Sequence, residues 1–160
     1  MRLSKTVLPA SLLLFVTLAL TGCGFSLAPL QVIVDATAAA LPVLEATGVP
    51  IPAQVVTYVG DVANCIGSLT TAPNASQIAT VSTCLTGQVA PQLTGLSKTI
   101  VTAIGVVVQA VQQFLTKAPA MQAQVAKVKT LTPAQNSQIA TMQSTARVTA
   151  FAAKRMVEKK

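Results

Sequence analysis

Two stretches of sequence, PAQVVTYVGDVANCIGSL (residues 52–69) and NASQIATVSTCLTGQV (residues 74–89), decide the fold. In both, apolar side chains recur at steps of three and four residues. The first stripe is Val55, Val59, Val62, Ile66 and Leu69, and the second is Ile78, Val81, Leu85 and Val89. This period is that of an amphipathic helix, whereas a half-buried strand alternates at every second residue. Pro52 can open the first helix and Asn74 can cap the second, so we expect a hairpin of two helices.

Cys65 and Cys84 lie on different arms of this hairpin, 19 positions apart. In an exported chain, two such cysteines are expected to form a disulfide, which would staple the hairpin. Cys65 is near the end of the first helix while Cys84 is well inside the second. The two cysteines can therefore lie at the same height along the hairpin only if the helices cross or the turn folds back over one of them. Free catalytic or metal-binding thiols are the alternative, which the absence of histidine and of a second cysteine pair disfavours.

Further helices are indicated on both sides of the hairpin. Residues 31–46 are rich in Ala, Val and Leu, and Pro42 is expected to kink or restart the helix there. A short helix is expected over residues 119–128, starting at Pro119. The run TPAQ (residues 132–135) has the form of a capping box, with Thr132 as N-cap and Gln135 at the third helical position. It opens a last helix that runs to about residue 157. The expected apolar stripe of that helix is Ile139, Met142, Ala146, Ala150, Ala153 and Val157.

The segment that begins at Pro91 has two interpretations. Its apolar residues keep a heptad-like spacing, at Leu93, Leu96, Ile100, Ala103, Val107, Val111 and Phe114. β-branched residues crowd the same segment, so residues 99–115 have strand propensity as well. The periodicity favours a helix, placed at the centre of a bundle. The sequence thus predicts an all-α fold: an antiparallel up-down bundle of five to six short helices.

Composition narrows the classes of function. The chain has 160 residues, of which 52% are hydrophobic and only 9% are charged. Residues 23–97 hold three acids and no base, whereas residues 98–160 hold nine bases and one acid, so the basic charge gathers toward the end. The basic residues near the C-terminus are candidate contacts for an anionic partner, although such a run can also be a solvated helix end: Arg147, Lys154, Arg155, Lys159 and Lys160. Nucleic acid is not expected as the partner, because one Tyr, four Phe and no Trp leave little to stack on bases.

Catalytic chemistry is not indicated. Without histidine there is no Ser-His or Cys-His pair, and no zinc site of the usual kind. Asp35, Glu45 and Asp61 are the acids available for a carboxylate pair, and a solvated role fits each of them better. We expect no enzymatic activity, no catalytic residue, no metal and no cofactor.

The N-terminus has the layout of an export signal. Arg2 and Lys5 precede a 14-residue apolar segment from Val7 to Leu20, which is short for a membrane span of about 20 residues. Directly behind it stands Leu20-Thr21-Gly22-Cys23. This run resembles the lipobox of bacterial lipoproteins. An ordinary signal peptide with a coincidental cysteine is the alternative, but its cleavage site usually has an A-x-A pattern.

The resemblance implies cleavage between Gly22 and Cys23, a diacylglyceryl thioether on Cys23, and commonly an N-acyl chain such as palmitate. In enteric-type bacteria, an Asp directly after the lipidated cysteine resembles the signal for retention in the inner membrane, and in this chain that position is Gly24. The resemblance therefore implies the periplasmic face of the outer membrane, or the plasma membrane if the organism has no outer membrane. The expected organisation is a signal peptide over residues 1–22, a lipidated tether over 23–30, and one helical domain over 31–160. Beyond the lipobox, the chain resembles no family that we can name.

Three functions fit these observations. The first is a non-catalytic structural or interaction module of the cell envelope, held at the membrane by its lipid and contacting an envelope protein or peptidoglycan. The second is a membrane-active accessory for lysis, secretion or pore formation, which inserts its apolar helices. The third is a small carrier that holds an apolar ligand inside the bundle.

Overall fold

The computed structural model describes residues 25–48, 51–70, 73–128 and 130–158. Within these ranges all regular structure is helical, which confirms the predicted fold class. The elements are α2 (Ala28–Ala46), α3 (Ala53–Gly67), α4 (Ala75–Cys84), the π-helical turn η2 (Leu85–Val89), α5 (Ala90–Thr94), α6 (Lys98–Ala103), α7 (Gly105–Val125) and α8 (Pro133–Glu158). Because α4, η2 and α5 follow one another without a break, they form one continuous rod. The strand that residues 99–115 could have formed is absent, since these residues lie in α6, in α7 and in the bend at Ile104 between them.

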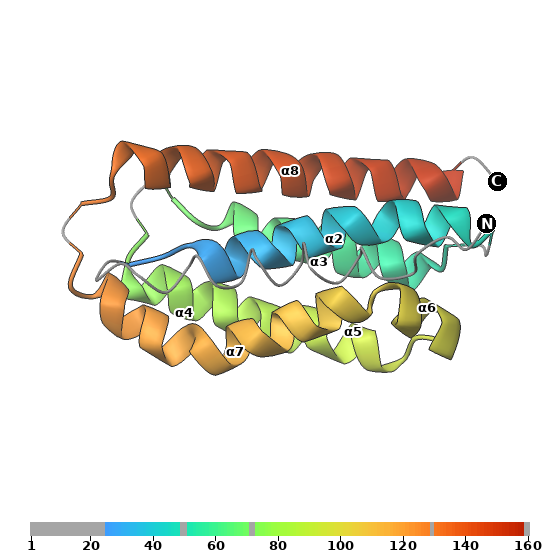
Figure 1. Cartoon of the computed structure of the whole chain (residues 1–160), viewed down its shortest axis with the longest axis horizontal. Coiled ribbons are helices and arrows are strands. Elements are labelled where there is room, and N and C mark those ends of the chain that lie inside the picture. Colours follow the sequence, from blue (N-terminus) through green and yellow to red (C-terminus); the bar gives the residue numbers. More distant parts are fainter. Residues whose placement is uncertain (1–24, 49–50, 71–72, 129, 159–160) are drawn as a thin grey trace, which may run out of the picture.

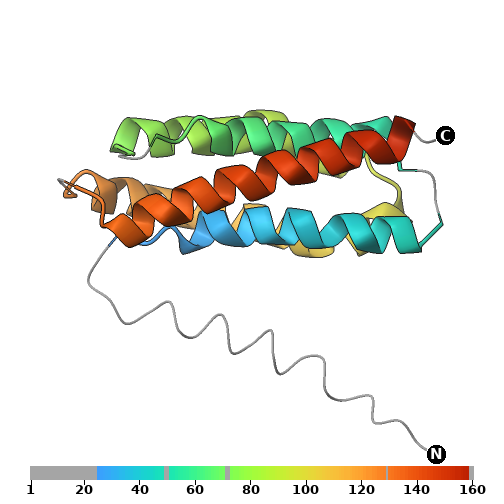
Figure 2. The ribbon, with the colours of Figure 1, turned by 90° about the horizontal axis from the view of Figure 1, so that it is seen from above.

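The rods form an antiparallel bundle in which the chain reverses direction from each long rod to the next (Figure 1). α8 is the outermost element and packs over α2 and α3, while α4 and α7 form the opposite layer (Figures 1 and 2). The first and last long rods, α2 and α8, are neighbours and run in the same direction. The described elements form five long rods, namely α2, α3, the continuous rod α4–η2–α5, α7 and α8. Because successive rods alternate in direction, the first and the fifth run the same way.

The core is built largely from the predicted apolar stripes, to which α2 adds residues such as Leu30 and Ile33. Of the predicted stripe residues, Leu96, Ala103 and Ala150 are only partly buried, and Val157 is exposed. All nine residues of the two hairpin stripes are buried, and the largest fully buried side chains of the bundle include Tyr58 and Phe114. Both predicted caps are confirmed. Asn74 Oδ1 accepts a hydrogen bond from Gln77 N at 2.9 Å, and Thr132 Oγ1 accepts one from Gln135 N at 3.2 Å. The helix starts are therefore encoded locally, and their buried sides are encoded by the three-four pattern.

The π turn keeps one rod in phase with the core. Buried side chains are spaced four residues apart in this part of the chain, at Val81, Leu85, Val89 and Leu93. An α-helix advances by about 100° per residue, so these three steps would rotate the buried side by about 120°. The π turn over Leu85–Val89 adds one residue to the helix, and this residue compensates for about 100° of the rotation.

Pro91 is accommodated beside the same turn. A proline has no N–H, and in an α-helix its ring crowds the carbonyl group four residues earlier, here that of Gly87. Ahead of the proline, Ala90 N–H donates to Leu85 O, five residues back, so the backbone is wider there than an α-helix. The apolar spacing and the proline therefore both favour a π turn at this position.

Of the kink or restart expected at Pro42, the restart is wrong, and so is the helix start expected at Pro119. α2 continues through Pro42, and the helix expected to start at Pro119 is the last part of α7. Both prolines are exposed, so the distortion that each causes lies on the solvent side of its helix. Buried neighbours on both sides, Leu41 and Leu44 around Pro42, keep the two halves of α2 packed against the same core.

The single central helix expected from Leu93 to Phe114 is also wrong. The chain bends after α5 and again at Ile104, so the segment is divided among α5, α6 and α7. Ile104 N–H donates to Ile100 O at 2.9 Å, and Ile104 O accepts from Val107 N at 2.8 Å. Ile104 thus ends α6 and begins α7 while its side chain stays fully buried. The heptad-like spacing persists across the bend because each part contributes its own residues to one core.

Residues 25–30, expected as part of a tether, belong to the folded domain. α2 starts three residues earlier than expected, and Phe25, Leu27 and Leu30 are 6%, 1% and 0% exposed. Phe25 O accepts a hydrogen bond from Gln135 Nε2 at 2.7 Å, which ties the start of the domain to the first turn of α8. Their apolar side chains explain the correction, since they are more stable in the core than in water. Cys23 and Gly24, the remaining residues of the expected tether, lie outside the described residues.

Candidate functional site

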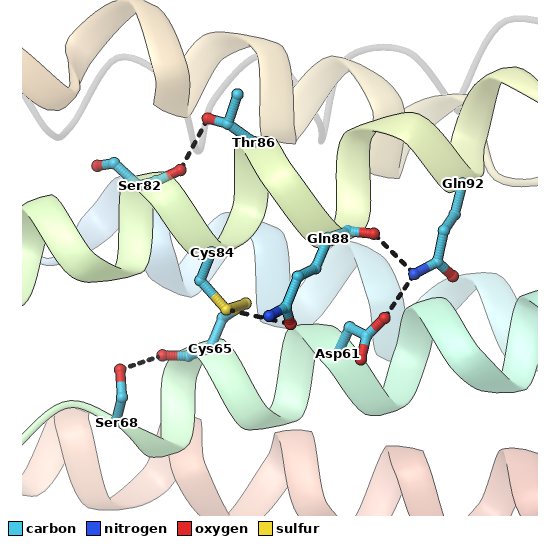
Figure 3. The surroundings of a disulfide bond; sticks show 8 residues. All are labelled: Asp61, Cys65, Ser68, Ser82, Cys84, Thr86, Gln88 and Gln92. Atoms are coloured by element: carbon cyan, nitrogen blue, oxygen red, sulfur yellow. Dashed lines mark hydrogen bonds between the residues drawn. A yellow bond between two sulfur atoms is a disulfide. The ribbon is translucent and has the colours of Figure 1, made fainter.

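The Cys65–Cys84 disulfide joins α3 to the last residue of α4, with 5.6 Å between the two Cα atoms (Figure 3). This separation lies in the usual range for disulfides and confirms the predicted pairing. The difference in level is resolved by the connection after Gly67, which continues along the bundle before α4 begins (Figure 1). Gln143 Nε2 of α8 donates to Leu69 O at 2.6 Å and holds this connection in place.

A polar contact reinforces the same seam one helical turn away. Asp61 of α3 accepts a hydrogen bond from Gln92 Nε2 of α5, and Gln92 Nε2 also donates to Gln88 O at 2.7 Å (Figure 3). Asp61 is four residues before Cys65, so the carboxylate and the disulfide lie on the same side of α3. The acid is therefore occupied in joining two helices, which is a structural role.

The other two acids considered for a carboxylate pair lie on α2. Asp35 accepts a hydrogen bond from Gln31 of the same helix at 2.7 Å, and both Asp35 and Glu45 are exposed. In the part of the chain that the structure describes, no group of three or more His, Cys, Asp or Glu side chains is placed to hold a metal ion.

The outer face of α8 carries the described part of the predicted basic region. Arg147, Lys154 and Arg155 are all exposed, and two large apolar residues stand among them: Val148 is 65% exposed and Phe151 is 63% exposed. At about 100° per residue these five side chains fall within an arc of about 120°. We call them the α8 patch. The buried residues of α8, such as Met142 and Ala153, lie on the opposite side of the helix.

Two contacts organise the α8 patch. The Arg155 guanidinium lies over the Phe151 ring, 5.8 Å from its centroid. Lys154 Nζ is 3.9 Å from Glu158 Oε1, an exposed i,i+4 pair. Such a pair contributes little to stability, so Lys154 remains free to exchange this partner for another anion.

Sequence reasoning found the bases of the α8 patch but missed its two apolar members. Val148 and Phe151 do not fall on the three-four spacing of the buried residues of α8. This mismatch could have predicted from the sequence that they are exposed. Val157, expected in the stripe, is 38% exposed and lies at the end of the helix. Of the remaining candidate residues, Gly22, Cys23, Lys159 and Lys160 lie outside the described residues.

Tyr58 is the one tyrosine of the chain, and its side chain is fully buried. Among the described residues its hydroxyl group has no hydrogen-bond partner, and burial raises the pKa of this phenol above its ordinary value of 10.0. The ring fills the core while its hydroxyl lacks a compensating contact, so Tyr58 is a packing residue that carries an energetic cost.

Two features bear on the membrane-active and carrier alternatives. Within the described ranges one helix, α2, is long and apolar enough to cross a membrane by length and composition, and it lies near the N-terminus. In the bundle α2 packs against α7 and α8 and contributes buried side chains along its length. A half-open depression of about 370 Å³ lies between the start of α4 and the end of α7, and its lining includes polar residues such as Asn74, Ser76 and Thr130.

No protein-family model matches this chain, and neither the curated proteins nor the solved structures contain a match to it. Its function is therefore argued from its own residues.

Proposed function

We propose that this protein is a lipid-anchored envelope protein whose mature part, residues 23–160, is a non-catalytic helical module. The carrying observation is the position of Leu20-Thr21-Gly22-Cys23: it follows the apolar segment and ends two residues before Phe25, the first buried residue described. Cleavage before Cys23 would leave all of the elements that the structure describes, from α2 to α8, in one piece. The module would face the periplasm from the outer membrane, or lie outside the plasma membrane of a cell without an outer membrane.

The disulfide supports the proposed compartment. Disulfides form and persist in oxidising surroundings and are rare in the cytosol. Cys65 of α3 and Cys84 of α4 form this bond, and the hydrogen bond between Asp61 and Gln92 joins α3 to the same rod. An exported chain would form this bond as it folds, which agrees with the signal-like N-terminus.

A structural or interaction role is favoured over catalysis by the disposition of the polar groups. Asp61 joins helices, Asp35 is paired within its own helix, and the exposed bases lie on a convex helix rather than in a pocket. General acid–base or nucleophilic catalysis needs groups that converge on a reacting atom. The α8 patch instead presents an extended surface, which suits contact with another large surface.

The test is fractionation of cells that produce the wild-type chain or the Cys23→Ser variant. We expect the wild-type protein in the membrane fraction, resistant to salt and released by detergent. Because Cys23 precedes Phe25, the first buried residue described, we expect Cys23→Ser to leave the bundle intact. The variant should lack bound fatty acid, and it should either keep residues 1–22 uncleaved or appear in the soluble fraction. Equal fatty-acid labelling of both chains, or a cytosolic wild-type protein, would overturn the proposal.

A further inference from the structure

We infer that the α8 patch docks on the anionic phospholipid surface of the membrane that holds the lipid anchor, so that α8 lies along the bilayer. This inference rests on the proposed function for the anchor. The patch supplies the second point of attachment.

The composition of the α8 patch matches an anionic bilayer surface. Arg147, Lys154 and Arg155 bring three cations to one face, where Glu158 pairs with Lys154. Val148 and Phe151 are more than half exposed between these cations. A helix face that combines Lys and Arg with exposed Phe and aliphatic residues is typical of segments that lie in the membrane interface. Peptidoglycan also offers carboxylates, but it has no apolar phase that would take up Phe151 and Val148.

The shape of the molecule agrees with this partner. Among the described elements, α8 forms a layer of its own on the outside of the bundle (Figures 1 and 2). The α8 patch lies on the side of this helix opposite its buried residues, so it forms a ridge that faces away from α2 and α3. A planar bilayer can contact such a ridge along its length. Arg155 stacks on Phe151, so the cation and the ring would reach the headgroup region together.

The position of the anchor places both contacts on one helix. Phe25 is bound to Gln135 in the first turn of α8, and Cys23 is two residues away, at most about 7 Å along the chain. From Gln135 to Phe151 the helix rises about 24 Å. A lipid at one end of α8 and a basic, apolar patch toward the other end would lay the helix flat. One lipid signal combined with a basic patch is also a common way to make membrane attachment stable.

The sequence offers a clean local probe, because the chain contains no tryptophan. Phe151→Trp places a single indole in the α8 patch. Val106→Trp is the matched control, since Val106 is 55% exposed on α7, in the layer opposite α8 (Figure 1). Both variants of the processed chain, purified from membranes, are reconstituted in phosphatidylcholine vesicles with or without phosphatidylglycerol. Brominated lipid then reports whether each indole reaches the acyl region.

We expect Trp emission at position 151 to shift to the blue and to be quenched by brominated lipid in the anionic vesicles only. High salt should reverse the effect. Replacing Arg147, Lys154 and Arg155 by Gln should lower the equilibrium constant for docking of the α8 patch by about two orders of magnitude. The reason is that each cation near an anionic surface strengthens binding about fivefold. The indole at position 106 should stay in water in both vesicles.

Equal emission from position 151 in neutral and anionic vesicles would overturn the inference, whether the indole is wet or buried in both. The same holds if position 106 responds as position 151 does. The lipid on Cys23 is checked separately by the mass of the purified chain, so a missing anchor is distinguished from a patch that does not dock. Circular dichroism of each variant confirms that the bundle is intact, which the exposure of both sites leads us to expect.

Discussion

Removing the disulfide should destabilise the bundle by a predictable amount. Cys65→Ala combined with Cys84→Ala deletes the cross-link and avoids placing a hydroxyl group at Cys65, which is 1% exposed. The bond closes a loop with a sequence separation of 19 residues. In the chain-entropy description, a loop of this length restricts the unfolded chain by an amount equivalent to about 3 kcal/mol. For a domain of this size the same loss lowers the thermal midpoint by about 10 °C.

Equilibrium unfolding in urea, followed by circular dichroism, measures this loss directly. The oxidised wild-type protein should have a free energy of unfolding about 3 kcal/mol above that of the double variant. Reductant should bring the wild-type protein close to the variant and leave the variant unchanged, which controls for packing lost with the sulfur atoms. If oxidised wild type and variant unfold at the same urea concentration, the cross-link does not constrain the unfolded chain as we reason. Free thiols at both Cys65 and Cys84 in the protein purified without reductant would refute the pairing itself.

Three further predictions concern the domain. Leu27→Ala should cost about 2–5 kcal/mol because Leu27 is buried, whereas the same change in a tether would cost nothing. Urea unfolding decides between the two, with Val32→Ala as the control because Val32 is 48% exposed on α2. Gly87→Ala should be neutral or stabilise the π turn by up to about 1 kcal/mol, since an added Cβ meets nothing within 4 Å. Deletion of Gly87, in contrast, should rotate Val89 out of the core and abolish cooperative thermal unfolding. If the deletion variant melts like the wild type, our account of the extra residue is wrong. Tyr58→Phe should be neutral or stabilising at neutral pH, because the hydroxyl lacks a partner. Because the pKa of Tyr58 is raised in the folded protein, this tyrosine ionises first in the unfolded chain as pH rises. The free energy of unfolding of the wild type should therefore fall above about pH 10, and Tyr58→Phe should lack this part of the decrease. The same pH dependence in both proteins would contradict the prediction.

Much of this fold could be predicted from the sequence, for a physical reason. The hairpin stripes and the caps at Asn74 and Thr132 are local features, and the structure confirms each of them. The disulfide pairing followed from the cysteine count once export was assumed. These features need no knowledge of which helix packs against which.

The errors arose where tertiary packing decides the local structure. Proline was expected to interrupt the helices at Pro42 and Pro119, yet the buried residues on either side keep α2 and α7 continuous. The opposite error occurred at Ile104, where unbroken periodicity concealed a bend between two helices that share a core. The four-residue spacing from Val81 to Leu93 did carry a readable signal for the π turn, because an α-helix cannot keep such a stripe on one side.

The candidate site was predictable only in part. The cations Arg147, Lys154 and Arg155 were evident from charge alone, but their common face and the exposure of Phe151 depend on which side of α8 is buried. That side is set by α2 and α3, which are distant in sequence. The short distance from Cys23 to the fold was likewise hidden until Phe25 proved to be buried.

Lipid attachment at Cys23, as we propose it, would restrict how the protein can work. Only Gly24 separates Cys23 from the first buried residue, so a lipid on Cys23 would hold the bundle against the membrane rather than on a flexible stalk. A module held this way can contact the bilayer and partners close to it. Reaching a distant cell-wall layer would require a partner that approaches the membrane.

The central claim is most directly tested by the mass of the N-terminal peptide of the protein isolated from membranes. Our account predicts that the chain begins at Cys23 and that this residue carries a diacylglyceryl group, with or without an additional N-acyl chain. A mature chain that begins at any other residue, or an unmodified Cys23 at its start, would contradict the account.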